Sequence, residues 1–317
     1  MKRILLLETL AADATAWLES RHQVVLADAP DQFESALATG EFDALITRGK
    51  GQVNAAILDR LAPSLKVVSR CGVGLDNVDV SACTERGIPV VNAPGATTVA
   101  VTEQTMFLIL AAVRNLLPVC AATKKGNWES RDSYTGDDLY GKRLGLIGMG
   151  DIASGVADIA SAFGMEVVFW NHREKESNYE QVDFDELIST SDVISIHVPL
   201  TDETRGIIGA EEFDQMKPEA ILINTGRGPH VNHKALETAL DRERIAGYAA
   251  DVFDPEPPNA EQIGLLQRPN VIVTPHISAL TRGSFDRMSM RTAKNVDAIL
   301  REGSPESGCI FNADKLS

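Results

Sequence analysis

The chain is poor in basic residues and in cysteine, and it has no long apolar run. It has 30 Lys and Arg against 45 Asp and Glu, and its net charge of −15 argues against nucleic acid or an anionic membrane as a partner. Its four cysteines form no C-x-x-C pair, which disfavours a zinc site or a disulfide framework and favours reduced thiols. No apolar stretch approaches the ~20 residues that cross a bilayer. We therefore expect a cytoplasmic protein with no metal, nucleic-acid or membrane partner.

Strand-like and helix-like segments alternate along the chain. Apolar runs typical of buried strands lie at Ile4–Leu7, Gln23–Leu26, Ala44–Thr47, Lys66–Ser69 and Pro89–Val91. Segments with helical spacing lie between them, near Ala14–Ser20, Gln32–Ala38, Ala55–Leu61 and Val80–Arg86. A long apolar helix is predicted from Val99 to Leu117, after which the alternation resumes, and a last helix is predicted from about Ser284 to Arg301. Repeated strand–helix units predict an α/β fold with two doubly wound parallel sheets.

A glycine-rich turn lies at Gly148-Met149-Gly150-Asp151-Ile152-Ala153, between a strand-like run and an amphipathic helical segment. In such a unit Gly148 permits the tight turn, and Gly150 leaves no side chain between the backbone and a pyrophosphate. The following helix presents free N–H groups and a partial positive charge to the phosphates. A second strand-like run ends at Asn171, about 20 residues on, where such units place the residue that contacts ribose. This context favours a dinucleotide cofactor, NAD or NADP, over an empty strand–helix–strand unit.

Further motifs follow one another in an order typical of one family. They are Arg70–Asp79 (RCGVGLDNVD), the glycine turn at Gly148, His197–Thr201 (HVPLT), Ile223–Gly228 (INTGRG), Ala250–Pro257 (ADVFDPEP) and Thr274–Ile277 (TPHI). With these motifs the chain resembles the D-isomer-specific 2-hydroxyacid dehydrogenases, and among them most of all the D-3-phosphoglycerate dehydrogenases. The motifs span nearly the whole chain, so the resemblance is specific.

The resemblance implies a Rossmann cofactor domain inserted into a flavodoxin-like substrate domain, with the active site in the cleft between them. The long helix marks the boundary, so we assign residues 1–98 and 284–317 to the substrate domain and residues 99–283 to the cofactor domain. The resemblance also implies a homodimer formed through the segment after Pro118. Because the chain ends near the last predicted helix, we expect the short form of the phosphoglycerate enzymes, which lacks a C-terminal regulatory domain.

Oxidation of a 2-hydroxy acid needs a base for the hydroxyl proton and a cation for the carboxylate and carbonyl. The resemblance implies that His276 carries the proton, that Glu256 holds its imidazole, and that Arg227 binds the substrate. Each residue alone could be structural: an Arg in a Gly-rich turn, a solvated Glu in a Pro-rich loop, or a His that caps a helix. Because all three stand in family order, we predict an NAD(P)-dependent D-2-hydroxyacid dehydrogenase.

The cofactor contacts implied by the resemblance and by the glycine turn lie in several loops. They are Gly148, Gly150, Asp151, Ile152, Asn171, His172, Arg173, Val198, Pro199, Thr225, Gly226, Asp251, His276 and Ser278. Two of them depart from the family pattern. Asn171 replaces the usual Asp and does not repel a 2′-phosphate, which Arg173 and His172 could bind, so NADP remains open beside NAD. Asp151 replaces a residue that is often Arg, and its carboxylate should weaken pyrophosphate binding unless it turns outward or caps the helix; of these two, we expect the cap.

The predicted substrate is a small anionic 2-hydroxy or 2-oxo acid. Arg48 and Arg70 follow predicted strands and match basic residues at the phosphate side of the phosphoglycerate enzymes, which favours 3-phosphoglycerate and phosphohydroxypyruvate. The resemblance also implies that Val73 and Gly74 offer backbone N–H groups to the substrate carboxylate, beside Arg227. The alternative is an NADPH-dependent glyoxylate or hydroxypyruvate reductase, which the uncharged Asn171 favours. A third possibility is a non-catalytic, NAD-sensing binding protein of the corepressor kind.

The remaining histidines carry weaker hypotheses. His22 is predicted to lie at the surface, and His197 to serve in packing. His230 and His233 form an H-x-x-H pair without an evident third ligand, so a metal site is disfavoured. This run replaces a more usual Gly-Val-Val-Asp-type run of the family, and the sequence assigns it no function.

Overall fold

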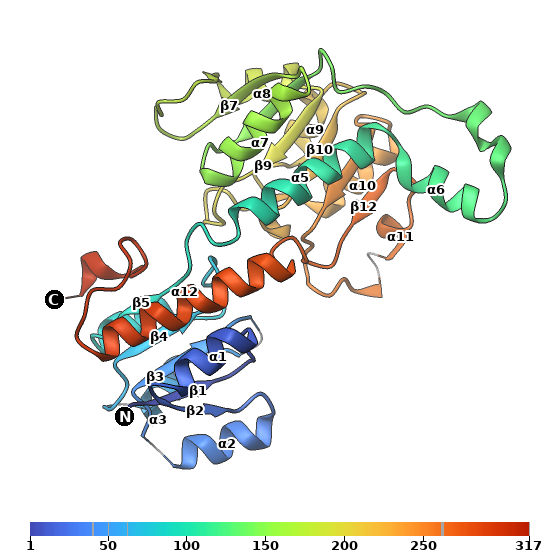
Figure 1. Cartoon of the computed structure of the whole chain (residues 1–317). Coiled ribbons are helices and arrows are strands. Elements are labelled where there is room, and N and C mark those ends of the chain that lie inside the picture. Colours follow the sequence, from blue (N-terminus) through green and yellow to red (C-terminus); the bar gives the residue numbers. More distant parts are fainter. Residues whose placement is uncertain (40, 50, 62, 261–262, 317) are drawn as a thin grey trace. The chain divides into compact units, whose positions relative to one another are not determined.

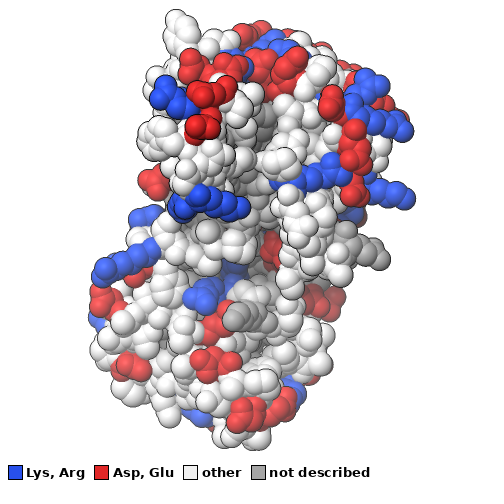
Figure 2. Space-filling view, turned by 90° about the vertical axis from the view of Figure 1, so that its right-hand side faces the viewer, with Lys and Arg blue, Asp and Glu red and all other residues white. Residues whose placement is uncertain are grey.

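The computed structural model describes residues 1–39, 41–49, 51–61, 63–260 and 263–316. They form two compact units, Met1–Thr97 with Leu280–Ser317 as unit 1 and Thr98–Ala279 as unit 2 (Figure 1). The predicted domain boundaries at residues 98 and 284 lie close to these divisions. Acidic and basic side chains are interspersed on the face shown in Figure 2.

Unit 1 is built on a five-stranded parallel sheet with the order β2-β1-β3-β4-β5, which is the flavodoxin-like order. Its strands are β1 (Arg3–Leu6), β2 (Gln23–Leu26), β3 (Ala44–Thr47), β4 (Val67–Arg70) and β5 (Val90–Val91). Its helices are α1 (Ala12–Glu19), α2 (Pro30–Ala38), α3 (Ala55–Leu61), α4 (Val80–Glu85) and α12 (Arg282–Leu300). The strands β1, β3, β4 and β5 are short and mostly buried, as a sheet covered by helices requires, whereas the edge strand β2 is partly exposed.

The core of unit 1 lies on both faces of this sheet. Ile4 and Leu6 face a cluster that includes Leu18 of α1 and Met288 of α12, whereas Leu5 faces a cluster that includes Leu58 of α3. This alternation along β1 follows from the two-residue period of a strand. Helices α1 and α12, far apart in sequence, lie side by side over one face (Figure 1).

Unit 2 is built on a seven-stranded parallel sheet with the order β12-β11-β10-β9-β6-β7-β8. Its strands are β6 (Arg143–Ile147), β7 (Glu166–Trp170), β8 (Glu180–Gln181), β9 (Val193–Ile196), β10 (Ile221–Asn224), β11 (Gly247–Ala250) and β12 (Val271–Val273). Its helical segments are α5 (Thr98–Val113), α6 (Leu116–Lys124), η1 (Trp128–Ser133), α7 (Asp151–Ala162), α8 (Phe184–Thr190), α9 (Ala210–Gln215), η2 (Gly228–His230), α10 (His233–Asp241) and α11 (Ile263–Leu266). The strand order reverses between β6 and β9, so the carboxyl ends of these strands form the switch point at which such sheets bind ligands.

The two faces of this sheet carry separate cores. One face packs apolar residues of α5 and α7 against the strands, and the other packs α8, α9 and α10. The prediction of two doubly wound parallel-sheet α/β domains is therefore confirmed.

The prediction of one helix from Val99 to Leu117 is wrong. The chain forms α5 and α6, which are bent by 73° relative to each other. The break lies at Asn115, which adopts a left-handed backbone conformation with φ 46°. Asn tolerates this conformation better than most residues, and Pro118 lies in the first turn of α6, where its missing N–H costs nothing. Apolar residues continue on both sides of the break, so the sequence pattern does not predict it.

Among the described residues, no single helix is long and apolar enough to span a membrane; only the bent pair α5 and α6 reaches the required length and composition together. The described residues also contain no group of three or more His, Cys, Asp or Glu side chains arranged to hold a metal ion.

Candidate active site

The predicted cofactor and catalytic residues of unit 2 follow the carboxyl ends of its strands. The glycine turn follows β6, Asn171 follows β7, Arg227 lies just beyond β10, Asp251 follows β11 and His276 follows β12. Since all strand pairs in this sheet are parallel, these loops emerge at one edge. The topology alone therefore gathers residues that are more than one hundred positions apart.

The glycine turn has the geometry that a dinucleotide-binding unit needs. Gly148 has φ 93°, and an added Cβ would lie 2.8 Å from the carbonyl oxygen of His197, so only glycine fits. Its N–H donates to the carbonyl of Trp170 at 2.8 Å, which fixes the turn to the end of β7. An added Cβ on Gly150 would meet no atom within 4 Å, so this backbone is open to a ligand.

The prediction that Asp151 caps α7 is wrong. The helix begins at Asp151 itself and Gly150 occupies the N-cap position, so the carboxylate belongs to the first turn and is exposed. An acidic side chain in the first turn still suits the positive end of the helix dipole.

The ribose-side loop is tied down by several hydrogen bonds. The Asn171 side-chain amide donates to the carbonyl of Arg173 at 3.0 Å, and Gln181 Nε2 donates to the carbonyl of Asn171 at 3.2 Å. Lys175 Nζ donates to the carbonyl of Met149 at 2.5 Å, which places an ammonium group beside the glycine turn. Sequence reasoning missed Lys175, because only the folded loop brings it back to the turn.

His276 and Glu256, which the sequence predicts to act together, lie in contact. His276 Nδ1 lies 2.8 Å from Glu256 Oε2, and the other Glu256 oxygen accepts the N–H of Phe253 at 3.0 Å. Partial burial raises the pKa of Glu256, but the His276 hydrogen bond, the Phe253 N–H and the charges of His276 and Arg227 outweigh it and lower that pKa below its ordinary value. The carboxylate is thus ionised near neutral pH and can hold an imidazolium.

The loop that carries His276 is organised by Asp251, which is 1% exposed. Its Oδ1 accepts the N–H of Ile277 at 3.0 Å and the hydroxyl of Thr274, and its Oδ2 accepts the N–H of Ser278 at 2.7 Å and the Ser278 hydroxyl. The N–H of His276 donates to the Asp251 carbonyl at 2.8 Å, and His276 adopts a left-handed φ of 54°. Asp251 and Ser278 therefore hold the backbone of the His276 loop in place, while their predicted contacts with the cofactor stay predictions.

The loop that carries Arg227 is equally constrained. Asn224, buried at the end of β10, donates its amide to the Arg227 carbonyl at 2.9 Å and accepts the N–H of Gly226 at 3.0 Å. Arg227 Nη1 donates to the Gly226 carbonyl at 2.8 Å. The Thr225 hydroxyl lies 2.9 Å from that of Thr105 on α5. These hydrogen bonds fix the backbone of the turn, and with it the position from which the Arg227 side chain extends.

The predicted residues Val198 and Pro199 follow β9, next to the glycine turn. The N–H of His197 donates to the carbonyl of Ile147 at 2.8 Å, and its Nε2 lies 2.9 Å from the hydroxyl of Ser195. These bonds join the loop to β6 and agree with the packing role predicted for His197.

The predicted substrate residues of unit 1 lie at the carboxyl edge of its own sheet. Arg70 ends β4 and Arg48 follows β3. Gly72, with φ 148°, leaves the space through which the Arg70 side chain passes. The Asn92 amide donates to the carbonyl of Val73 at 2.8 Å, which fixes the loop that continues to Gly74.

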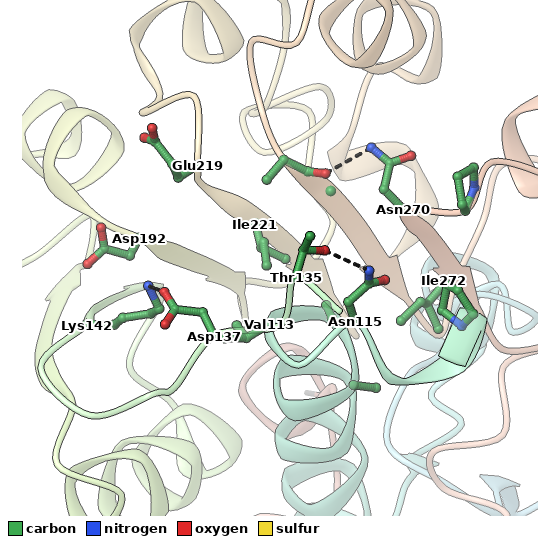
Figure 3. Close-up of a pocket in the computed structure, with 16 residues that line it drawn as sticks. Val113, Asn115, Thr135, Asp137, Lys142, Asp192, Glu219, Ile221, Asn270 and Ile272 are labelled. Carbon is green, nitrogen blue, oxygen red and sulfur yellow. Dashed lines mark hydrogen bonds and ion pairs between the residues drawn. The ribbon is translucent and has the colours of Figure 1, made fainter. Parts of the chain in front are cut away.

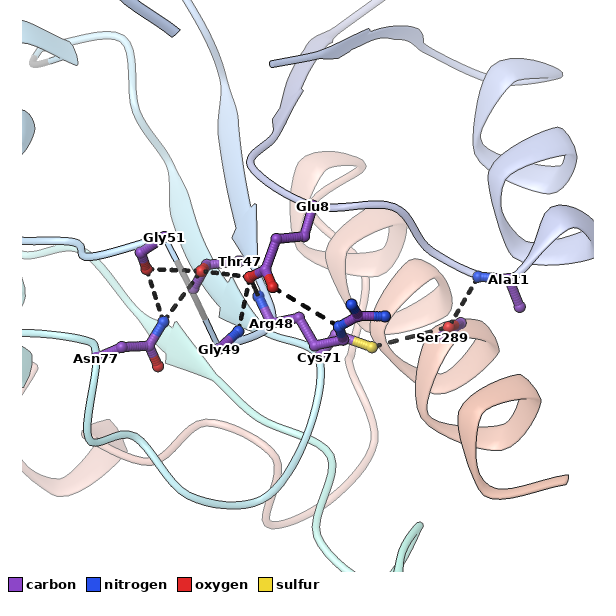
Figure 4. Close-up of polar contacts among 9 residues, drawn as sticks. All are labelled: Glu8, Ala11, Thr47, Arg48, Gly49, Gly51, Cys71, Asn77 and Ser289. Carbon is purple, nitrogen blue, oxygen red and sulfur yellow. Dashed lines mark hydrogen bonds and ion pairs between the residues drawn. The ribbon is translucent and has the colours of Figure 1, made fainter. Parts of the chain in front are cut away.

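Sequence reasoning missed Glu8, a buried carboxylate that organises the Arg48 loop (Figure 4). Glu8 Oε2 accepts the N–H groups of Arg48 and Gly49 at 2.7 and 2.6 Å, and its Oε1 lies 3.7 Å from Arg48 Nε. The Arg48 guanidinium also lies 5.2 Å from the ring centre of Phe285. Glu8 directly follows the apolar run of β1, and a charged residue just beyond a buried strand was the signal in the sequence.

The prediction that His22 lies at the surface is wrong. The residue is 4% exposed, and its Nε2 lies 2.8 Å from Asp297 Oδ1 on α12. His22 directly precedes β2, so the fold of unit 1 places it against a helix that is more than 250 residues away in sequence.

Two cavities of about 420 Å³ lie in unit 2, at different edges of the sheet. One is lined by Glu256, His276 and apolar residues that include Phe253 and Val273. The other lies at the amino ends of β10 to β12 (Figure 3) and is lined by none of the predicted site residues.

Comparison with known proteins agrees with this geometry. Residues 106–278 match the family model for the NAD-binding domain of the D-isomer-specific 2-hydroxyacid dehydrogenases. The chain is 38% identical to the glyoxylate reductase of Thermococcus litoralis over 87% of this chain and 86% of that protein. It is 39% identical to the D-3-phosphoglycerate dehydrogenase of Methanocaldococcus jannaschii over 95% of this chain and 58% of that protein. The crystal structure of the TT0316 protein of Thermus thermophilus matches with a TM-score of 0.88 and 36% identity, over 96% of this chain and 98% of that one.

Unit 2 is thus a doubly wound unit of the dinucleotide-binding kind, and it presents an Arg, a Glu and a His at one edge of its sheet. The chain belongs to the D-isomer-specific 2-hydroxyacid dehydrogenases. It spans 58% and 49% of the lengths of two phosphoglycerate dehydrogenases that it matches, and 86% of the glyoxylate reductase.

Proposed function

We propose that the protein transfers a hydride between a nicotinamide dinucleotide and a D-2-hydroxy acid. The observation that carries this proposal is the 2.8 Å contact between His276 and Glu256 on loops beside the Arg227 turn. An imidazole held by an ionised carboxylate is a proton carrier that works near neutral pH. A guanidinium fork is the side chain best suited to hold a carboxylate.

The residues of unit 2 fit the dinucleotide that the family model implies. Gly150 is open above the turn, and the first N–H groups of α7 face the space where a pyrophosphate would bind. Asn171 and Arg173 would contact the ribose end, and Thr225 and Gly226 the nicotinamide end. When bound, the reduced nicotinamide supplies the hydride that the carbonyl carbon of the substrate accepts.

The chain's own residues supply the proton and the charge. In the direction of reduction, Arg227 holds the carboxylate of the 2-oxo acid and polarises its carbonyl. His276 Nε2 gives its proton to the carbonyl oxygen, while Nδ1 keeps its hydrogen bond to Glu256. The product is the 2-hydroxy acid, and His276 regains a proton from solvent. In the reverse direction, neutral His276 takes the hydroxyl proton.

The test is steady-state reduction of phosphohydroxypyruvate, hydroxypyruvate and glyoxylate, each with NADH and with NADPH. Turnover of at least one substrate with one cofactor supports the proposal. If cofactor binds but none of the six pairs is turned over, the non-catalytic binding protein becomes the better description. The same data decide the cofactor, because an uncharged Asn171 does not exclude the 2′-phosphate of NADPH.

For the substrate we propose phosphohydroxypyruvate, and 3-phosphoglycerate in the reverse direction. Arg48 and Arg70 end neighbouring parallel strands, so their side chains start from the same edge of the unit 1 sheet. Two guanidinium groups at one edge suit a phosphate dianion better than an uncharged substituent. This assignment would place the protein in serine biosynthesis.

Replacing Arg70 by Ala should raise the KM for phosphohydroxypyruvate about 30-fold, because a charge-assisted contact with the phosphate is lost. The KM for glyoxylate, which has no phosphate, should change less than about threefold. Arg60→Ala, which removes an exposed arginine paired with Glu34 in the same unit, is the matched control. Equal increases for both substrates would contradict phosphate recognition by Arg70.

A glyoxylate or hydroxypyruvate reductase is the second candidate, and Glu8 is the observation that favours it. The buried Glu8 carboxylate beside Arg48 offsets part of the positive charge that a phosphate would need. The glyoxylate reductase of Thermococcus litoralis also matches over most of its length. Higher kcat/KM for glyoxylate than for phosphohydroxypyruvate would establish this candidate.

We further propose that the protein is a homodimer through α5, α6 and the segment that follows. Neither α6 nor η1 has a buried residue, yet they expose Leu116, Leu117 and Trp128, the last at 71%. Phe107 of α5 is also 48% exposed. Apolar side chains gathered on one segment usually mark an interface.

The dimer should have about twice the chain mass of 34.2 kDa in analytical ultracentrifugation. Replacing Leu117 and Trp128 together by Glu should shift it to the monomer, because each protomer would then bring two charges into the interface, where they would be desolvated. Val119→Thr, a mild change on α6, serves as the control. A monomeric wild-type protein would contradict the proposal.

A further inference from the structure

The H-x-x-H pair, His230 and His233, lies between the turn of Arg227 and the loop of Glu256. His230 ends η2, directly after the Arg227 turn, and is 0% exposed. His233 begins α10, and its ring stacks on Phe253 with the ring centres 4.1 Å apart and an angle of 26°. Neither imidazole belongs to the proposed chemistry, and each touches backbone that carries a residue of the proposed catalytic trio.

The contact of His230 is with the backbone of Arg227 itself. The N–H of Arg227 donates to His230 Nδ1 at 3.1 Å. A backbone N–H can only donate, so Nδ1 must be the bare nitrogen of a neutral ring. Burial lowers the pKa of His230 to about 4, which keeps the ring neutral near pH 7. Together with the Asn224 amide on the Arg227 carbonyl, this bond holds the peptide groups on both sides of Arg227.

The contact of His233 is with the neighbouring loop. His233 Nδ1 lies 3.3 Å from the carbonyl oxygen of Asp254, and a carbonyl can only accept, so this nitrogen carries the hydrogen. The N–H of Phe253, on which the His233 ring stacks, donates to Glu256 Oε1 at 3.0 Å. The two histidines therefore need opposite neutral tautomers, and each suits the group that it faces.

The two loops also touch directly. A Cβ on Gly228 would collide with the carbonyl of Phe253, so the Arg227 turn packs against the Glu256 loop without a side chain between them. His230 bonds to the Arg227 turn on one side of this contact, and His233 bonds to the Glu256 loop on the other. A small displacement of either loop would thus move Arg227 relative to Glu256.

We propose that His230 and His233 are positioning residues, which fix the Arg227 turn and the Glu256 loop in register with each other. The inference rests on the proposed function, because it gives both loops their catalytic purpose. The positioning role requires no metal, because each histidine of the H-x-x-H pair makes a hydrogen bond to a backbone group. Loosening the Arg227 turn should weaken binding of the substrate carboxylate more than binding of the cofactor.

The test compares His230→Leu, which removes the acceptor, with His230→Asn, whose side-chain oxygen can take the place of Nδ1. His230→Leu should raise the KM for the best 2-oxo acid about tenfold, because a buried N–H is left without a partner, and should leave the Kd of the reduced cofactor within about twofold. His230→Asn should return the KM to within about threefold of wild type. Asn232→Ala, which removes the N-cap of α10, controls for loss of stability in the same segment and should leave the KM unchanged.

Binding of oxamate, a non-reacting 2-oxo acid analogue, to the enzyme with NADH or NADPH gives a readout that does not depend on turnover. Weaker oxamate binding in His230→Leu, restored in His230→Asn, supports the proposal even if the natural substrate is another acid. If the wild-type enzyme is active and His230→Leu has the same KM and the same affinity for oxamate, the positioning role is overturned. The proposed function is then left intact. A wild-type protein that neither turns over an oxo acid nor binds oxamate overturns both.

Discussion

Replacing His276 by Ala should lower kcat for reduction of the preferred 2-oxo acid about 10³-fold, with the Kd of the cofactor changed less than about twofold. The reason is that only an imidazole at this position can give a proton to the carbonyl oxygen near neutral pH. Its ring is held by a 2.8 Å contact with Glu256 and its backbone by the Asp251 carbonyl. Kinetics with NADH and NADPH, together with fluorescence titration of the cofactor, measure the two effects separately.

The companion variant for this prediction is Glu256→Gln, which keeps the size and one acceptor of the side chain but removes its charge. Because the ionised carboxylate favours the protonated imidazole that reduction requires, its loss should move the alkaline limb of the pH profile for reduction to lower pH. The fall in kcat should be about tenfold, smaller than for His276→Ala. A variant His276→Ala that keeps wild-type turnover would exclude His276 as the acid, whatever the profile of Glu256→Gln.

Replacing Arg227 by Ala should lower kcat/KM for 2-oxo acids about 10³-fold, which corresponds to about 4 kcal/mol of lost transition-state stabilisation. A guanidinium can bind the carboxylate with two parallel hydrogen bonds and can also polarise the carbonyl as charge develops on its oxygen. Both contributions disappear with the side chain. Steady-state kinetics over a range of substrate concentrations separates the loss in kcat from the rise in KM.

Arg227→Lys tests whether charge or geometry matters. Lysine keeps the charge but lacks the planar fork, so about a tenth of the wild-type kcat/KM should remain. Arg242→Ala, which removes an exposed arginine after α10 in the same unit, is the matched control and should change kcat/KM less than about twofold. If Arg227→Lys is as active as wild type, simple charge steering replaces the bidentate contact as the explanation.

The two loops that carry these residues are held mainly by buried polar side chains. Asp251 accepts hydrogen bonds from both sides of His276, and Asn224 bonds on both sides of the Arg227 turn. Buried polar groups that are fully paired specify one conformation, because each lost partner leaves a desolvated group unsatisfied. The proposed catalytic geometry thus depends on buried residues outside the proposed catalytic trio.

The glycine turn shows how far sequence reasoning reaches. Its spacing after β6 predicted the strand, the turn and the helix, because each depends on residues close together in the chain. Arg227 and His276 were instead identified by the family resemblance, and the parallel sheet brings their loops to one edge. The prediction for Asp151 failed, because the helix begins one residue earlier than a cap at Asp151 would need. Asp151 therefore lies in the first turn and not at the N-cap position.

Periodicity and turn chemistry are local properties, and from them the sequence predicted the two parallel-sheet units and the dinucleotide turn. The residues of the candidate site were predicted from the family resemblance. The tertiary structure then selected the partners of those residues. It placed Glu8 against Arg48, brought Lys175 back to Met149, buried His22 against Asp297 and joined His230 to Arg227. It also broke the long apolar helix at Asn115. These features depend on hydrogen bonds between packed elements and on single backbone conformations, which a pattern of apolar and polar residues does not encode.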